Sequence, residues 1–308
     1  TEQNILVLLV SFSDIDFTHT VSSFDSLMFG SSNSVKSYYL ENSYNNFTIK
    51  KANETDSSNG GKENDGLISV KLSIPHPNSG KDSSNIKKSI KAAFEASDSK
   101  INFSAFDTNK NGDISVEELS VVLIYAGYET AYGSDAALKP NIWGHKWGID
   151  KITLDGVTLS PYTAFGEQHA TSIENANQAS IGIMAHEFGH LMLKLPDLYD
   201  YDSSSAGIGV WGLMAAGSWN GGGHSPAYLT GWSKIQSGII EPNTITSNLT
   251  QTALTPADTS NSYLRVWLDK YQLEEHLILE NRQQNNFDKH LPGSGLLITH
   301  INPQKTGN

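Results

Sequence analysis

Cysteine is absent from all 308 residues of the sequence. Its absence excludes disulfide bonds, thiolate ligands for a metal and a cysteine nucleophile. Any metal that the protein binds must therefore be held by nitrogen and oxygen atoms. A chain of this length without cysteine is compatible with a secreted bacterial protein.

Long apolar runs and positive charge are also scarce. No stretch reaches the length of about 18 apolar residues that a membrane-spanning helix needs, and the longest runs, such as residues 5–10, have the length of a strand. Lys and Arg number 21 against 33 Asp and Glu, a formal net charge of −12. We therefore expect no membrane span and no general affinity for nucleic acid. The hydrophobic content of 38% fits a globular protein of one large domain or two subdomains.

The most informative segment is the pentapeptide His186-Glu-Phe-Gly-His190, which has the pattern HExxH. Residues four apart lie on the same face of a helix, so both imidazoles can reach one Zn²⁺. Glu187 then lies beside a metal-activated water, whose proton it can take as the general base. The pattern predicts a zinc-dependent hydrolase.

The residues around the pentapeptide favour a helix. About two chains per hundred of this composition would contain HExxH by chance, so this context decides the interpretation. The segment Thr171-Ser-Ile-Glu174 resembles a capping box, and it predicts that the helix begins about five turns before His190. Apolar residues recur at helical spacing opposite the histidines, at Met184, Phe188, Leu191 and Leu195.

A catalytic zinc needs a third protein ligand, and the sequence offers two candidates. Asp197 follows a proline that ends the helix and lets the chain turn back towards the metal. Glu280 is the candidate far downstream. Asp197, Asp200 and Asp202 together can also be explained as a solvated turn or a calcium site.

A second metal pattern occupies residues 107–118. Oxygen donors fall at positions 1, 3, 5, 9 and 12 of a calcium loop, glycine at position 6 and a main-chain carbonyl at position 7. An apolar strand follows in place of a long helix, so we expect a structural calcium site rather than a regulatory switch. The side chains and the carbonyl come from Asp107, Asn109, Asn111, Asp113, Ser115 and Glu118.

Patterning elsewhere predicts an α+β protein. Expected strands are residues 4–12, 47–51, 67–74, 121–126, 263–268 and 276–280, and expected helices are residues 34–43, 84–96 and a short one near 227–234. Asp155-Gly156 predicts a two-residue hairpin turn within residues 151–161. We expect an upper α/β subdomain, residues 1–195, that carries the calcium loop and the zinc helix, and an irregular lower subdomain, residues 196–308.

With these residues, the chain resembles the immune inhibitor A family of secreted bacterial metallopeptidases, in the metzincin clan. The resemblance extends over nearly the whole chain. Its segments are LLVSFSD (8–14), SVKSYYLENSY (34–44), the calcium loop with VVLIYAG (121–127), IWGHKW (142–147), residues 186–200, GLMAAGSW (212–219) and ENRQQNNFDKHLPGSGLLITHI (280–301).

The resemblance implies a metzincin-like fold, a twisted mixed sheet with an active-site helix. It implies that Met214 lies in the turn beneath the metal and that Asp197 is the third ligand. Two features depart from the family pattern, which has its aspartate six residues after the second histidine and a glycine where the helix breaks. Here Asp197 is the seventh residue after His190, and Lys194 stands at the glycine position. A non-glycine residue in a left-handed turn costs about 1 kcal/mol.

Other conspicuous residues have plainer interpretations. We expect His145 to pack between Trp143 and Trp147, and Glu280 and Arg282 to form a structural ion pair. His224 and Tyr228 are weaker candidates for the substrate cleft. Ala216 stands two residues after Met214, where metzincins often have a tyrosine.

The predicted function is a secreted zinc endopeptidase, stabilised by calcium, that cleaves proteins or peptides held in extended form along an edge strand. The alternative is a calcium-stabilised binding or adhesion module of the same fold, in which the altered segment after His190 has weakened zinc binding. The intact Glu187 argues against this alternative, because a site that only binds has no need of a base.

Overall fold

A computed structural model of the chain describes residues 1–78, 83–133, 138–268 and 275–303. It forms two compact units that are interleaved in the sequence. The first comprises residues 1–36, 48–180 and 190–192, and the second comprises residues 37–47, 181–189 and 193–308. The predicted boundary between residues 195 and 196 stays a prediction of domain organisation.

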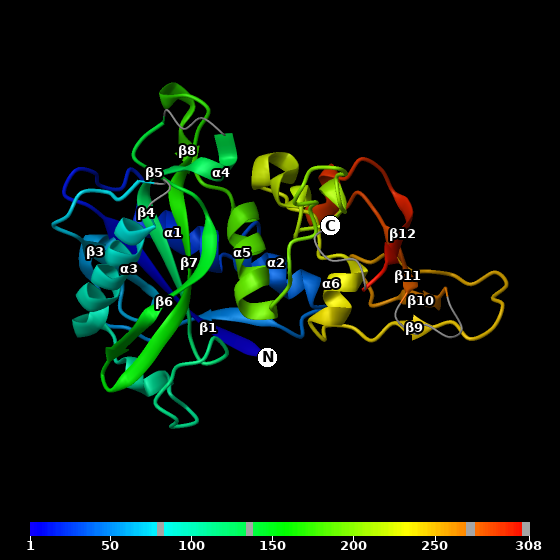
Figure 1. Cartoon of the computed structure of the whole chain (residues 1–308), viewed down its shortest axis with the longest axis horizontal. Coiled ribbons are helices and arrows are strands. Elements are labelled where there is room, and N and C mark those ends of the chain that lie inside the picture. Colours follow the sequence, from blue (N-terminus) through cyan, green and yellow to red (C-terminus); the bar gives the residue numbers. More distant parts are fainter. Residues whose placement is uncertain (79–82, 134–137, 269–274, 304–308) are drawn as a thin grey trace. The chain divides into compact units, whose positions relative to one another are not determined.

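The first unit is built on a mixed sheet of eight strands (Figure 1). The main path runs β2-β1-β4-β7-β6, while β3 pairs with β1, β5 with β4 and β8 with β7. Only the pairs of β7 with β6 and with β8 are antiparallel. The strands are β1 (Glu2–Ser11), β2 (Thr48–Lys51), β3 (Leu67–Lys71), β4 (Ser120–Glu129), β5 (Asn141–Ile142), β6 (His145–Leu154), β7 (Val157–His169) and β8 (Asn177–Gln178).

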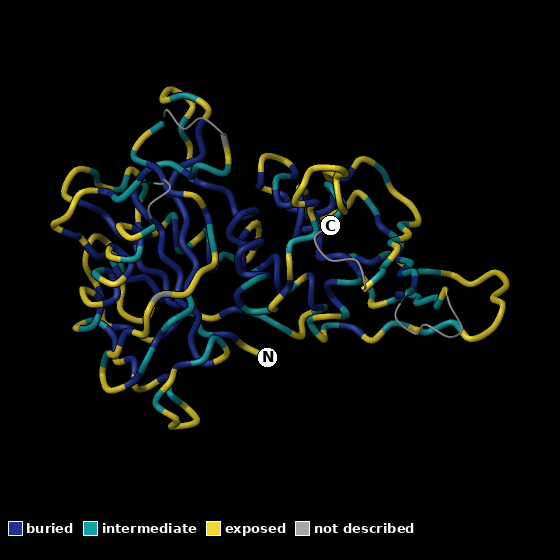
Figure 2. Tube along the Cα trace, in the orientation of Figure 1, coloured by how far each residue is buried: buried dark blue, intermediate teal, exposed yellow. Residues whose placement is uncertain are grey.

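The central strands are apolar on both faces because both faces are buried (Figure 2). Leu6, Leu8 and Val10 point from β1 to the face that α3 (Ser84–Ser97) covers, and they belong to one core with Ile90 of that helix. Their neighbours Ile5, Val7 and Leu9 point the other way and are equally buried. The strand therefore anchors two layers of packing.

Of the two local predictions, the hairpin turn and the capping box, the structure confirms one. Asp155 and Gly156 adopt φ values of 49° and 79° between the paired ends of β6 and β7, so the predicted hairpin is confirmed. The predicted capping box is wrong as the start of the zinc helix. Ser172 and Asn175 cap a 3-10 helix, η4 (Ile173–Asn175), and the chain then pairs as β8 before α5 (Ile181–Leu193) begins.

Shorter elements complete the first unit. The sequence prediction missed α1 (Val21–Phe29), which Thr20 caps by accepting a hydrogen bond from the Ser23 N–H. The remaining elements are η1 (Ser58–Gly60), η2 (Asp98–Lys100), η3 (Phe103–Phe106) and α4 (Thr130–Gly133).

The second unit contains a four-stranded sheet of order β12-β11-β10-β9 and several short helices. The predicted helix at residues 34–43 is observed as α2 (Val35–Asn42), and the predicted strands at 263–268 and 276–280 are observed as β10 (Tyr263–Trp267) and β11 (His276–Arg282). The other elements are η5 (Gly209–Trp211), η6 (Ala216–Gly223), α6 (Gly231–Gln236), β9 (Asn243–Thr244), η7 (Asn286–His290) and β12 (Gly295–Ile301).

The predicted α+β class, with a twisted mixed sheet, is confirmed. Within the described residues, no helix is long and apolar enough to cross a membrane.

His76 is a buried, titratable group in the first unit. Its ring lies 4.7 Å from the ring of Phe12 and 5.7 Å from that of Tyr125, measured between centroids. Its Nδ1 accepts a hydrogen bond of 3.0 Å from the Asn78 N–H, so Nδ1 carries no hydrogen. Burial lowers the pKa of His76 from 6.5 to about 4, although Asp14 acts in the opposite direction.

This histidine makes the stability of the protein depend on pH. The unfolded chain takes up the proton below pH 6.5, and the folded protein only below about pH 4. The contribution of His76 is complete above pH 6.5 and is lost as the pH falls to 4, about 3 kcal/mol in all. Chemical denaturation at pH 7 and pH 4 should show a larger loss for the wild type than for His76→Gln. Equal losses would contradict the prediction.

Candidate metal centre

Two glycines let α5 approach the segment 212–223 closely. A Cβ built on Gly182 would lie 1.9 Å from the Ser218 carbonyl oxygen, and one built on Gly189 would lie 2.5 Å from Met214 Sδ. A side chain at position 182 would force the two backbones apart, and one at position 189 would displace the Met214 side chain. The glycine of the HExxH pentapeptide is therefore the point at which the helix rests on Met214.

His186, His190 and Asp197 form a group with metal-binding geometry. Each offers one ligand atom, and these atoms all lie within 4.8 Å of one another. No other group of three or more such residues was found in the described parts of the chain. The two histidines come from successive turns of α5, and Asp197 comes from the segment that follows the helix.

The hydrogen bond of His186 Nδ1 directs Nε2 of the same ring toward Asp197. This Nδ1 lies 2.9 Å from the Leu213 carbonyl oxygen, which can only accept, so Nδ1 carries the hydrogen. In the neutral ring, the lone pair of Nε2 then faces Asp197 Oδ1 at 3.1 Å. Two tetrahedral zinc ligands at about 2.0–2.1 Å from the metal lie about 3.3 Å apart. The side chains present therefore fit Zn²⁺, whose charge would remove the repulsion between these two acceptors.

The end of α5 explains how a chain with one residue more than the family pattern still brings Asp197 to the histidines. Lys194 adopts the left-handed conformation, with φ of 55°, at the place where the helix ends. The Leu195 N–H then donates to the Gly189 carbonyl, six residues earlier, at 3.1 Å. The closing bond of a Schellman motif spans five residues, so this wider turn takes up the additional one.

The backbone that follows helix α5 is hydrogen-bonded to the segment that contains Met214. The Leu198 N–H donates to the Met214 carbonyl at 2.7 Å, directly after Asp197. Met214 itself is buried. Backbone hydrogen bonds of Leu195 and Leu198 therefore fix the chain before and after Asp197. The Leu213 carbonyl accepts from His186, and the Met214 carbonyl accepts from Leu198. Met214 remains the residue expected in the turn beneath the metal.

Two tyrosines that the sequence reasoning overlooked lie beside Asp197. The phenols of Tyr199 and Tyr201 both interact with the Asp197 carboxylate, and their ring centroids are 5.4 Å apart. Burial and then the negative charge of Asp197 raise the pKa of both phenols, which remain protonated donors. The only signal in the sequence is their spacing of two and four residues from the aspartate.

Glu280, the alternative third ligand, lies elsewhere. Its side chain is fully buried and accepts a hydrogen bond of 3.0 Å from the Gly231 N–H, while Oε2 lies 3.7 Å from Arg282. The expected ion pair with Arg282 is thus observed. Burial raises the pKa of Glu280 from its usual value.

Tyr228 and His145 have structural partners. The Tyr228 hydroxyl donates to Glu41 at 2.8 Å, and His145 contacts the Trp143 carbonyl and the ring of Trp147, as expected. Asp200 accepts hydrogen bonds from the Ser204 hydroxyl and the Ser205 N–H, which close the turn after Asp197.

Residues 107–118 form a loop in which side-chain oxygen atoms accept hydrogen bonds from N–H groups of the same loop. Asp107 accepts from the N–H groups of Asn111 and Gly112, and Asn111 accepts from that of Asp113. Gly112 has φ of 82°, which the sharp turn at position 6 requires.

Two residues hold this loop in shape: Glu118 at its last position and Ile114 at its eighth. Burial opposes ionisation of Glu118, but hydrogen bonds from Ser115, Thr108 and Asn109 outweigh it and lower its pKa to about 2. The loop's eighth residue, Ile114, donates to the Thr158 carbonyl at 2.8 Å and so ties the loop to β7. All the side-chain oxygens expected for calcium belong to this one loop, and Glu118 is ionised.

Lys194→Gly should stabilise the protein by roughly 1 kcal/mol, since glycine adopts the left-handed conformation without the Cβ strain of lysine. Urea denaturation measures the free energy of unfolding. Lys194→Ala is the control, because it removes the lysine side chain but keeps the strain, and it should bring no gain. Equal stability of the wild type and the glycine variant would refute the argument.

A comparison of the sequence with known families gives one match. Residues 1–237 match the family described as immune inhibitor A peptidase M6, catalytic domain. No curated protein matches the chain. Hydrolysis of peptide bonds with the help of a metal is the activity of this family, its substrates are proteins or peptides, and the twisted mixed sheet is compatible with a metzincin-like fold. The chain therefore belongs to the immune inhibitor A family of metallopeptidases.

Proposed function

We propose that the protein is a zinc-dependent endopeptidase in which Glu187 is the general base. The observation that carries the proposal is the convergence of His186, His190 and Asp197 within 4.8 Å. Nitrogen and oxygen ligands of this kind and number are those of a catalytic zinc site, which keeps one position open. The altered segment after His190 does not argue for a weakened site, because the wider turn at Lys194 returns Asp197 to the histidines.

The protein's own groups have separate tasks in this reaction. Zn²⁺, when bound, would act as a Lewis acid that makes a water more acidic and polarises the scissile carbonyl. Glu187 follows the first histidine on α5, and its side chain is buried like that of His186. It takes a proton from the attacking water and delivers it to the leaving amine. The Leu213 carbonyl holds His186 in the tautomer that presents the lone pair of Nε2 to the metal.

We also propose that residues 107–118 bind Ca²⁺ and thereby stabilise the first unit. The loop supplies the side-chain oxygens of Asp107, Asn109, Asn111, Ser115 and Glu118, and the main chain of Asp113. The Asp113 carboxylate is bound to Lys151 at 2.7 Å, which is consistent with a main-chain role for this residue. Glu118 supplies a full negative charge, since its pKa is lowered to about 2.

Secretion and an extended substrate complete the proposal. A chain without cysteine suits a protein that works outside a bacterial cell, and calcium is available there. Strand β6 pairs only with β7 in the described sheet, so one of its edges offers backbone groups to a peptide in extended form.

Glu187→Gln should keep zinc and lose at least two orders of magnitude in kcat, roughly what a general base contributes. Zinc content by mass spectrometry and cleavage of a quenched peptide test both parts. Glu174→Gln makes the same substitution at an exposed glutamate and should retain full activity. Near-normal turnover by Glu187→Gln would reject the base. Zinc-loaded, folded wild type that cleaves nothing in a broad peptide library would favour the binding module.

Calcium at one hundred times its Kd should raise the free energy of unfolding by about 2.7 kcal/mol. The expected gain comes from binding to the folded loop alone, so Glu118→Gln should lose most of it. Thermal unfolding with calcium and with a chelator provides the measurement. Glu117→Gln removes the same charge at a position that supplies no ligand, and it should respond to calcium as the wild type does. An equal response of Glu118→Gln would exclude this loop as the site.

A further inference from the structure

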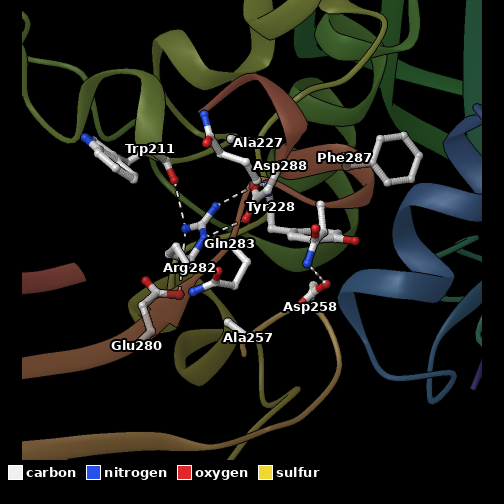
Figure 3. Close-up of polar contacts among 12 residues, drawn as sticks. Trp211, Ala227, Tyr228, Ala257, Asp258, Glu280, Arg282, Gln283, Phe287 and Asp288 are labelled. Atoms are coloured by element: carbon white, nitrogen blue, oxygen red, sulfur yellow. Dashed lines mark hydrogen bonds and ion pairs between the residues drawn. The ribbon is translucent and has the colours of Figure 1, made fainter. Parts of the chain in front are cut away.

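Arg282 is fully buried at the end of β11 and binds three different parts of the second unit (Figure 3). Its Nε and one terminal nitrogen donate to the two carboxylate oxygens of Asp288, both at 2.7 Å. The other terminal nitrogen donates to the Trp211 carbonyl at 2.9 Å and lies 3.7 Å from Glu280. One guanidinium thus joins β11, η7 and η5.

The Trp211 carbonyl lies immediately before the segment that supports the metal centre. Gly212 and Leu213 follow it, and the Leu213 carbonyl accepts the hydrogen bond from His186 Nδ1 at 2.9 Å. The Leu213 N–H points to the Tyr228 carbonyl at 3.4 Å. Leu213 is therefore held between two segments, one that contains Trp211 and one that contains Tyr228.

The same ion pair holds both of these segments. Arg282 binds the Trp211 carbonyl, and Asp288 Oδ1 accepts a hydrogen bond of 2.9 Å from the Tyr228 N–H. The partner of His186 is thus fixed on both sides by Arg282 and Asp288. Neither residue belongs to the part of the chain, residues 1–237, that matches the family catalytic domain.

We propose that Arg282 is a positioning residue of the metal centre, which sets the Leu213 carbonyl and, through it, the orientation of the His186 imidazole. The residue touches neither metal nor substrate. It acts through the backbone that runs from the Trp211 carbonyl over Gly212 to the Leu213 carbonyl. The functional unit of the peptidase accordingly extends to at least Asp288.

Arginine suits this task because a planar guanidinium with five N–H donors can bind a carboxylate with two bonds and a carbonyl with a third. Burial disfavours the charge, but Glu280 and Asp288 outweigh it and raise the pKa of Arg282 above its usual value. The cation is therefore permanent. Lysine carries the same charge as a point and cannot reproduce the three directions.

The test is Arg282→Lys in the full chain, with Arg265→Lys as the matched control. Arg265 lies on the neighbouring strand β10, and its guanidinium rests over the ring of Trp267 at 5.3 Å. We expect Arg282→Lys to weaken zinc binding by roughly 10- to 100-fold, as loss of support for a ligating histidine does. Arg265→Lys should leave the affinity unchanged.

A second readout needs neither metal nor activity. In metal-free protein, NMR of the imidazole should show that the His186 Nδ1 hydrogen exchanges faster with solvent in Arg282→Lys. The amides of Leu213 and Ala215 should exchange faster too. A purely structural role would lower the melting temperature and leave the zinc affinity and the His186 signal of the folded protein unchanged, and that result would overturn the proposal.

Two further variants keep the test decisive. Glu280→Gln leaves the bond from Arg282 to Trp211 in place and should keep zinc affinity near that of the wild type. If Arg282→Lys does not fold, Asp288→Asn replaces it, because a neutral amide cannot hold the guanidinium with two charged bonds; an unchanged affinity in that variant would also overturn the proposal.

The proposal rests on a metal at His186. Wild type that binds zinc but cleaves no peptide would refute the proposed function and leave this test intact.

Discussion

The contact between α5 and Met214 is the constraint on which the site depends. Gly189 lies between the two histidines of the helix, and it has no side chain because Met214 Sδ fills that place. The helix thereby comes close enough for His186 to reach the Leu213 carbonyl. This close approach brings His186 to the segment that contains Leu213 and Met214. The Leu213 carbonyl then accepts a hydrogen bond from His186, and the Met214 carbonyl accepts one from the backbone after Asp197.

The additional residue after His190 shows how a fixed site tolerates a change in chain length. An insertion inside α5 would rotate the following residues by about 100° and separate the histidines. At the end of the helix it costs only the strain of Lys194 in a left-handed turn and one wider hydrogen-bonded ring. The Leu198 N–H donates to the Met214 carbonyl, and Asp197 lies beside His186 and His190. The three residues thus come together in this chain although Asp197 is the seventh residue after His190.

Local patterns in the sequence predicted the local parts of the site, and long-range contacts were beyond them. HExxH and the calcium loop each lie within one short segment, so spacing alone identified their residues. The segment Thr171–Glu174 misled because Ser172 and Asn175 cap a single turn as well as they would a long helix, and pairing of β8 with β7 decided between the two. Helix α1 was missed because four of its nine residues are serine or aspartate at exposed or half-exposed positions, which blurs the apolar period.

The network around Arg282 could not be predicted for a different reason. The arginine and glutamate at 280–282 suggested an ion pair between near neighbours, and that pair is present at 3.7 Å. The shorter and more numerous bonds go to Asp288 and to the Trp211 carbonyl, 71 residues away. A backbone carbonyl leaves no mark in a sequence, so only the fold reveals this partner. Because a buried cation must satisfy its donors, the position of Trp211 is fixed by Arg282 as firmly as by its own neighbours. Arg282 and Asp288 lie beyond the residues that match the family catalytic domain, and they help to position the segment that contacts His186.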